Sequence, residues 1–283
     1  KRPNNFCFNS ARFALSIKNI LLFFASCVNY FDKPKFHCYY IFMLRSLLNG
    51  LKNLIYPNYC LACKNKIDPG RKEHFICGSC QEGIEMNLPP FCSYCGRTLD
   101  EDSRGRNTCS GCLNTKFNFD RAFSPCKYTG TVKKMIHEFK YSSRDYLGKN
   151  LGQILNNFIK EYNLPISCVD FVIPVPLHNA RLREREFNQA QILSERVAKE
   201  FNKELLLKVL IRTKATETQT ELNLKERQRN VKNSFSVTDP QLIKDKSLLL
   251  IDDVLTTGST LNEAAKSLKA CGARIVFALT LAN

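Results

Sequence analysis

The sequence predicts an α/β protein in which helices flank a mostly parallel β-sheet and a cysteine-rich module precedes the sheet. From about residue 122 onward, short apolar segments alternate with longer segments of helical periodicity, the order that builds βαβ units. Before residue 115, eight cysteines recur at regular intervals. The chain has 283 residues, of which 44% are hydrophobic, so it can bury the core of one large domain or of two unequal ones.

Residues 1–42 differ from the rest of the chain. They precede the first methionine, Met43, and hold isolated apolar clusters without sustained periodicity. Their longest apolar stretch, residues 20–28, is too short to cross a bilayer, which takes about 20 residues. We interpret residues 1–42 as an upstream extension, with a divergent leader as the alternative. We expect a short helix at residues 43–55, no membrane span and a cytoplasmic location.

The chain is strongly basic. Lysine and arginine outnumber aspartate and glutamate by 42 to 26, which gives a formal net charge of +16. Such an excess favours polyanionic partners, either nucleic acid or phosphorylated substrates. The charge by itself identifies no particular partner.

Eight of the 14 cysteines form four CxxC pairs, and a shift of 32 residues superimposes the first two pairs on the second two. The pairs are Cys60 and Cys63, Cys77 and Cys80, Cys92 and Cys95, and Cys109 and Cys112. Two CxxC pairs at this separation supply four thiolates to a tetrahedral Zn²⁺, so the sequence predicts a double zinc ribbon at residues 56–114 with two structural zinc ions. We expect each zinc to bind within one repeat rather than in a cross-brace between repeats. A disulfide framework is disfavoured, because CxxC pairs favour metal or redox use.

Three glycines, Gly78, Gly96 and Gly111, lie inside or just after the CxxC pairs. There the backbone must turn tightly and offer N–H groups to sulfur. We expect metal binding to supply the folding energy of this small module. Residues 114–121 are expected to link it to a second domain at residues 115–283.

The elements of this second domain follow from hydrophobic periodicity and from the positions of proline and glycine. In chain order they are an edge strand at 122–130, helices at 131–142 and 146–162, a strand at 169–173, a helix at 187–201, strands at 205–210, 235–237 and 248–252, a helix from 259 to about 272, and a strand at 274–282. The apolar segment 248–252 reads as a buried parallel strand. In parallel sheets, ligands bind at the carboxyl ends of the strands.

A candidate binding site follows that strand. Asp252 and Asp253 end the apolar run, and a loop rich in hydroxyl groups, residues 256–260, leads into the next helix. Backbone N–H groups and the helix dipole at a helix N-terminus favour an anion, and the carboxylates can bind sugar hydroxyls or a Mg²⁺ shell. The loop lacks the lysine of a Walker-type nucleotide loop, which disfavours phosphoryl transfer. The pattern therefore predicts a ribose 5-phosphate site, with a plain capped helix as the alternative.

The segment LLLIDDVLTTGST also resembles the PRPP-binding signature of type I phosphoribosyltransferases. The resemblance implies a type I phosphoribosyltransferase fold for residues 115–283. It further implies that Asp252 and Asp253 contact the ribose hydroxyls, with Mg²⁺ nearby. The 5-phosphate would then be held by Thr256, Thr257, Gly258, Ser259 and Thr260.

Further segments resemble the ComF family, whose members carry P-V-P-L-H followed by R-x-R-G-F-N-Q-A. This chain has IPVPLH followed by RLREREFNQA, and its FKYSSRDYLG is similar to the family's F-K-Y-x-G stretch. The family segment T-x-x-Q-x-x-L-x-x-x-x-R-x-x-N corresponds here to Thr216, Gln219, Leu222, Arg227 and Asn230. The double zinc ribbon completes the family arrangement.

The resemblance also implies roles for the segment that follows residue 173. Residues 174–178 are expected at the position of the pyrophosphate loop, with Arg183 and Arg185 able to bind phosphate bidentately. A solvated helix face is the alternative for these arginines. The chain departs from the family pattern at two positions, where Glu186 and Ser143 stand in place of glycine. We expect the charge of Glu186 to weaken pyrophosphate contacts.

The ComF family is associated with DNA uptake in natural competence, the basis of natural transformation. The resemblance implies a protein that binds PRPP or ribose 5-phosphate with Mg²⁺, and a phosphoribosyltransferase would displace pyrophosphate from C1 of PRPP. The sequence indicates no pocket for an acceptor substrate, and no segment resembles the glutaminase domain of an amidophosphoribosyltransferase. The alternative is a non-catalytic module that binds single-stranded DNA or a helicase-like competence partner and uses the ribose-phosphate site for recognition only.

Overall fold

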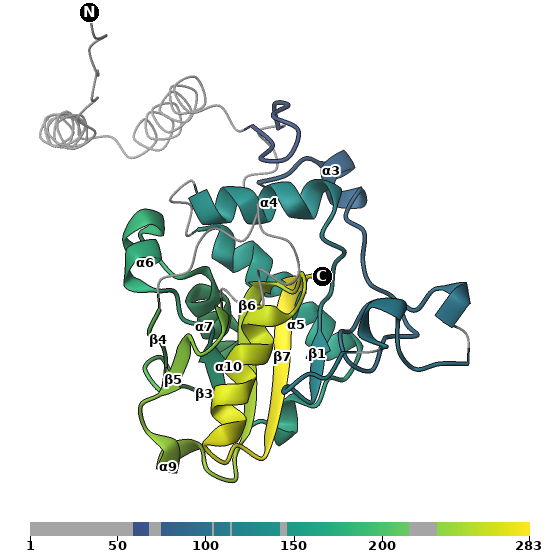
Figure 1. The fold of residues 1–283 in the computed structure, drawn as a ribbon. Coiled ribbons are helices and arrows are strands. Elements are labelled where there is room, and N and C mark those ends of the chain that lie inside the picture. The colour runs from purple at the N-terminus through teal and green to yellow at the C-terminus, as the bar shows by residue number, and fades with distance from the viewer. Residues whose placement is uncertain (1–58, 68–74, 104, 114, 142–145, 215–230) are drawn as a thin grey trace, which may run out of the picture. The chain divides into compact units, whose positions relative to one another are not determined.

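The computed structural model describes residues 59–67, 75–103, 105–113, 115–141, 146–214 and 231–283 (Figure 1). Within this part of the chain, Tyr59–Asn283 form one compact unit. The expected extension at 1–42, the expected helix at 43–55, Ser143 and the motif residues between 216 and 230 lie outside the described residues. Among the described helices, none has the length and hydropathy that a membrane crossing requires.

Five strands form the main sheet, in the order β1-β7-β6-β2-β3, and every pairing between neighbours is parallel. The strands are β1 (Arg121–Phe123), β2 (Phe171–Pro174), β3 (Glu204–Leu205), β6 (Ser247–Val254) and β7 (Ile275–Ala282). The central strands β6 and β7 are the longest, and their residues are almost continuously buried. Burial of both faces explains their unbroken apolar sequences. The predicted parallel sheet is confirmed.

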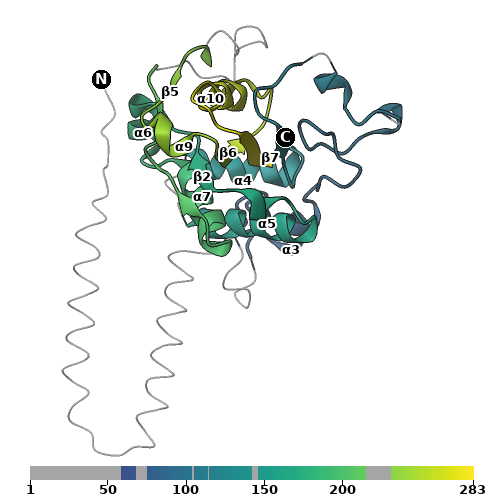
Figure 2. The same ribbon diagram turned by 90° about the horizontal axis from the view of Figure 1, so that it is seen from below.

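Helices cover both faces of this sheet, as Figure 2 shows. The described α-helices are α3 (Gly78–Glu82), α4 (Gly130–Tyr141), α5 (Leu147–Glu161), α6 (Asn179–Arg185), α7 (Gln189–Glu200), α9 (Pro240–Ile243) and α10 (Ser259–Ala270). Leu249 and Ile251 of β6 belong to the core shared with α4, α5 and α7, whereas Leu248 and Leu250 belong to the core shared with α10. This alternation follows from the two-residue period of a strand. The sheet therefore separates two hydrophobic cores.

Three segments differ from the sequence-based expectation. The strand expected at 205–210 is divided between β3 of the main sheet and β4 (Leu210–Arg212), which pairs antiparallel with β5 (Phe235–Val237). The edge strand expected at 122–130 is the short β1. Of the segment expected to be a linker, 114–121, the described residues 115–121 include the buried Phe119 and the first residue of β1. These residues are part of the packed domain, because Phe119 lies in the core and Phe117 packs against it.

The cysteine-rich module repeats its backbone geometry as well as its sequence. Antiparallel bridges join Tyr59 to Lys66 and Phe91 to Thr98, which are equivalent pairs after the shift of 32 residues. The N–H groups of Cys77 and Cys109 donate to the sulfurs of Cys60 and Cys92, in both cases over 3.4 Å.

The same turn position of both repeats has a positive φ angle, 63° at Lys64 and 74° at Gly96. Gly78 and Gly111, by contrast, lie in helical turns. Of the three glycines singled out in the sequence, Gly96 is therefore the one whose left-handed backbone favours glycine. A side chain at this position would also meet the Ala122 carbonyl oxygen, 2.7 Å from an added Cβ.

Each repeat brings its four cysteines together, and the sulfurs of each group lie within 4.8 Å of one another. The distances Cys63 Sγ–Cys77 Sγ and Cys95 Sγ–Cys109 Sγ are both 3.7 Å. A tetrahedral zinc with Zn–S bonds of about 2.3 Å places its sulfurs about 3.8 Å apart, so the four thiolates fit this ion. Pairing within each repeat is confirmed. Four protein ligands close the coordination sphere, which makes both sites structural.

Hydrogen bonds join the module to the sheet domain. The buried Asn87, which lies between the two repeats, donates through its side chain to the carbonyl oxygens of Ser124 and Cys126 and to Asn283 Oδ1, over 2.9–3.0 Å. Asn283 in turn donates to the carbonyl oxygen of Cys95 over 2.8 Å. The cysteines of both repeats also belong to the two hydrophobic cores of the sheet domain. Metal binding is thus supplemented by packing against the rest of the unit.

Glu186 ends α6 in a left-handed conformation, with φ of 67°, and its side chain is exposed. This explains why glycine is expected at the position, because a side chain in this region costs about 1–2 kcal/mol.

We predict that Glu186→Gly raises the free energy of unfolding by about 1 kcal/mol, since the gain in the folded backbone exceeds the added freedom of the unfolded chain. Urea unfolding measures the change. Asn163→Gly is the matched control, because Asn163 also follows a helix with positive φ but asparagine tolerates this conformation. A gain at Asn163 as large as that at Glu186 would contradict the explanation.

Candidate functional site

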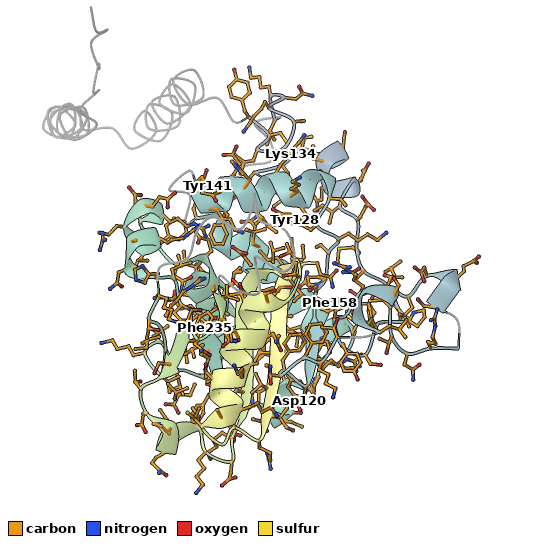
Figure 3. All side chains as sticks on the ribbon, in the orientation of Figure 1. Asp120, Tyr128, Lys134, Tyr141, Phe158 and Phe235 are labelled. Carbon is orange, nitrogen blue, oxygen red and sulfur yellow. The ribbon has the colours of Figure 1, made fainter. Side chains whose placement is uncertain are left out.

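A cleft of about 320 Å³ lies where β6 ends, and its walls come from α4, the segment after β2, α6, α7 and the N-terminus of α10. Tyr128 and Tyr141 both line it and lie near one end of the sheet in Figure 3, whereas Asp120 lies at the other end. Among the described residues that line the cleft, five are lysine or arginine and two are aspartate. The cleft therefore has an excess of positive charge and is suited to an anionic ligand.

The two aspartates are Asp252 and Asp253, which we call the acid pair. They are among the last residues of β6 and do not follow it, because the strand continues to Val254. Asp252 pairs in register with Thr280 of β7. Asp253 is buried and Asp252 is partly buried. Oδ1 of Asp252 accepts a hydrogen bond of 2.9 Å from the backbone N–H of Asp253.

Asp253 forms an ion pair with Lys140 of α4, over 2.9 Å from Nζ to Oδ2. Both side chains are largely shielded, with exposed fractions of 18% for Lys140 and 12% for Asp253. Burial alone would lower the pKa of Lys140, but the charge of Asp253 and its hydrogen bond outweigh this effect. The net result is a raised pKa of Lys140. Lys140 is therefore a stable cation that balances the charge of Asp253.

Asp252 has a different electrostatic environment. Burial raises its pKa, and the charge of Asp253 raises it further, to about 7. The hydrogen bond from the Asp253 N–H and the charges of Lys140 and Arg212 oppose this shift only in part. The acid pair thus divides into Asp253, which is neutralised by a lysine, and Asp252, which titrates near neutral pH.

Residues 256–260, which we call the phosphate loop, all line the same cleft. The hydroxyl of Thr257 lies 2.8 Å from that of Ser259 and accepts a hydrogen bond of 3.4 Å from the Ser259 N–H. Gly258 precedes the first turn of α10 with φ of 75°, a conformation that favours glycine. The loop therefore directs the N-terminus of a twelve-residue helix toward the cleft, where its dipole favours an anion.

The two arginines expected to bind phosphate are separated by the structure. Arg185 lines the cleft, where its guanidinium donates to Gln189 Oε1 over 3.2 Å and lies 5.2 Å from the ring centre of Tyr141. Arg183 is exposed on the same helix and is not among the residues that line the cleft. Of the expected proline segment, Val175 and Leu177 line the cleft.

Four further basic residues line the cleft although the sequence did not single them out: Lys133, Lys140, Arg181 and Arg212. Burial lowers the pKa of Arg212, the charge of Asp252 opposes this shift, and the charges of Arg181 and Arg185 add to it. Arg212 thus lies near Asp252 and near the guanidinium groups of Arg181 and Arg185. Lys140 is the lysine of the FKY segment at residues 139–141. This segment resembles a family motif, but the resemblance assigns no role to its lysine.

Comparison with known proteins adds two domain matches. The model of the double zinc ribbon domain matches residues 51–113, and that of the phosphoribosyl transferase domain matches residues 189–283. Together with the parallel sheet and the two four-cysteine groups, these matches establish a type I phosphoribosyltransferase fold with an N-terminal double zinc ribbon.

Three curated proteins are similar over most of their length. Competence protein F of Haemophilus influenzae is 29% identical over 75% of this chain and 91% of its own. DNA utilization protein YhgH of Escherichia coli K12 is 27% identical over 79% and 96%, and competence protein ComFC of Bacillus subtilis is 25% identical over 77% and 90%. The two domains in this order and the similarity across nearly the whole of these relatives make the chain a homologue of competence protein F, YhgH and ComFC.

Proposed function

We propose that the cleft binds the ribose 5-phosphate part of PRPP or of a related phosphorylated ribose, in a protein that takes part in DNA uptake. The observation that carries this proposal is that the acid pair and the phosphate loop line one cleft. Carboxylates accept hydrogen bonds from the hydroxyls of a sugar, and the N-terminus of a helix favours its phosphate. A ribose 5-phosphate carries both groups on one small molecule.

The acid pair has unequal roles in this proposal. Lys140 already occupies an oxygen of Asp253, so Asp252 is the carboxylate that accepts the ribose hydroxyls. Mg²⁺ that accompanies PRPP would also meet Asp252, where it would neutralise part of the charge of the diphosphate. Asp253 then acts mainly through Lys140, by holding a positive charge in the cleft.

The arginines give a second binding position for an anion. Arg181, Arg185 and Arg212 line the same cleft, and Arg212 lies close enough to interact electrostatically with the other two arginines and with Asp252. Guanidinium groups bind phosphate bidentately. We propose that they contact the diphosphate at C1 of PRPP.

The wider role rests on the relatives, whose names refer to competence and DNA utilization. The net charge of +16 is compatible with a nucleic-acid partner. In this proposal the protein acts in the cytoplasm, where the zinc thiolates remain reduced. Pyrophosphate release by the full chain in the presence of nucleobase, nucleoside or amine acceptors distinguishes transfer from binding alone.

We predict that Asp252→Asn lowers the affinity for ribose 5-phosphate by about 10- to 100-fold, because hydrogen bonds to a charged acceptor are lost. Affinity for inorganic phosphate should change little, since that ligand needs only the phosphate loop. Isothermal titration calorimetry on the full chain measures both. Failure of the unsubstituted protein to bind either PRPP or ribose 5-phosphate would refute the proposed function.

Arg185→Ala and Arg183→Ala form a matched pair on one helix. We expect Arg185→Ala to weaken PRPP binding by about tenfold or more while leaving ribose 5-phosphate binding unchanged, because only PRPP carries the diphosphate. Arg183→Ala should leave both affinities unchanged, since Arg183 does not line the cleft. Equal losses in the two variants would show that general surface charge, and not the cleft, binds the diphosphate.

The raised pKa of Asp252 predicts a pH dependence. With a pKa of about 7, Asp252 loses its charge as the pH falls through this value and then accepts fewer hydrogen bonds from a ribose. The affinity advantage of the unsubstituted protein over Asp252→Asn should therefore be full near about pH 8 and shrink by about pH 5.5. The ratio of the two affinities removes the effect of the sugar phosphate's own protonation, whose second pKa is about 6, because this effect is the same for both proteins. A ratio that stays constant with pH would contradict this role.

A further inference from the structure

The two zinc ribbons are equivalent in sequence but pack in different places. Cys60 of the first ribbon lies in the core that contains residues of α4, α5 and α7. All four cysteines of the second ribbon lie in the other core, together with Leu255 and Leu261, which flank the phosphate loop. A structural role for zinc does not by itself explain why the second ribbon packs in the core that flanks the phosphate loop.

Phe117 lies directly against the phosphate loop. A Cβ atom added to Gly258 would be 3.1 Å from Cε1 of Phe117, so the ring packs against the glycine backbone. The next residue, Asn118, donates from its backbone N–H and from its side chain to Oδ1 of Asn262, over 2.6 and 3.0 Å. The N–H of Asn262 donates to the carbonyl oxygen of Gly258 over 2.8 Å. Residues 117 and 118 therefore support the first turn of α10 at two points.

Phe117 is held in turn by aromatic residues that lead to the second zinc site. It stacks on the buried Phe119, with ring centres 4.6 Å apart and planes inclined by 21°. Its ring centre lies 6.1 Å from that of Tyr94, which stands between the ligands Cys92 and Cys95. The carbonyl oxygen of Tyr94 accepts a hydrogen bond of 2.7 Å from the N–H of Ala122 in β1. A continuous set of contacts thus connects the second zinc site, the edge of the sheet and the phosphate loop.

We propose that the second zinc ribbon, but not the first, positions the phosphate loop, and that Phe117 is the residue through which it acts. Its effect on ligand affinity rests on the proposed function. Zinc fixes the turn that carries Tyr94, Tyr94 and Phe119 fix the ring of Phe117, and the ring limits the backbone of Gly258 to the conformation that presents loop N–H groups to an anion. Without this support the loop samples other conformations, and binding must first order it.

Phe117→Ala tests the contact without touching a zinc ligand. We expect faster hydrogen exchange of the backbone N–H groups of residues 257–262 and at least a fivefold loss of affinity for ribose 5-phosphate in the folded protein. Phe117→Leu, which retains much of the packing volume, should restore both. Phe75→Ala is the matched control, because Phe75 is also half-buried but belongs to the first ribbon. Its ring packs against that of Tyr146, with ring centres 4.7 Å apart. It should leave both quantities unchanged.

The duplication supplies a second matched pair for zinc itself. The double variants Cys77→Ser/Cys80→Ser and Cys109→Ser/Cys112→Ser remove equivalent ligands, and each should retain about one zinc per chain by metal analysis. We expect the variant in the second ribbon to reproduce the effect of Phe117→Ala on exchange and affinity. The variant in the first ribbon should keep the exchange rates of the phosphate loop.

Hydrogen exchange keeps the two proposals separate. If the unsubstituted protein does not bind ribose 5-phosphate, the proposed function fails, while the exchange rates of residues 257–262 still decide whether the second ribbon supports the loop. Unchanged exchange in Phe117→Ala, or equal acceleration in Phe75→Ala, overturns the inference even if one zinc variant does not fold.

Discussion

The ion pair between Lys140 and Asp253 is the interaction on which the geometry of the cleft depends. A carboxylate buried at the end of a central strand is costly unless an opposite charge accompanies it. Lys140 comes from the last turn of α4, so the pair holds this helix at the end of β6. Its neighbours then contact the next helices: Tyr141 meets Arg185 of α6, and the carbonyl oxygen of Phe139 accepts from Gln189 of α7. One electrostatic requirement in β6 thereby arranges three helices around the cleft.

Features encoded by neighbouring residues were predictable from the sequence. The strand β6 and the helix α10 have strong periodicity and a glycine at their junction, and each zinc site is specified by the spacing of four cysteines. These patterns depend little on the rest of the chain. Thr256 and Ser259, which the sequence assigned to the same site as the acid pair, line one cleft with it because β6 leads directly into α10.

Features that depend on tertiary packing were not predictable in the same way. Lys140, Arg181 and Arg212 come from separate parts of the chain and meet only when the sheet forms. Arg183 and Arg185 looked equivalent in the sequence, but residues two positions apart point to different sides of a helix. Arg185 therefore lines the cleft, whereas Arg183 is exposed to solvent. The glycine expected at Glu186 was recognised from the family pattern, whereas its reason, a left-handed backbone, required the structure.

The geometry at Gly96 has a consequence for how the duplicated module can change. The first repeat has Lys64 at the equivalent turn, and its side chain extends to Glu138 on α4. In the second repeat any side chain would collide with the carbonyl oxygen of Ala122 in the edge strand. The two copies are therefore no longer interchangeable. Recombination that replaced the second repeat with a copy of the first would keep all eight zinc ligands and still force the module away from the edge of the sheet.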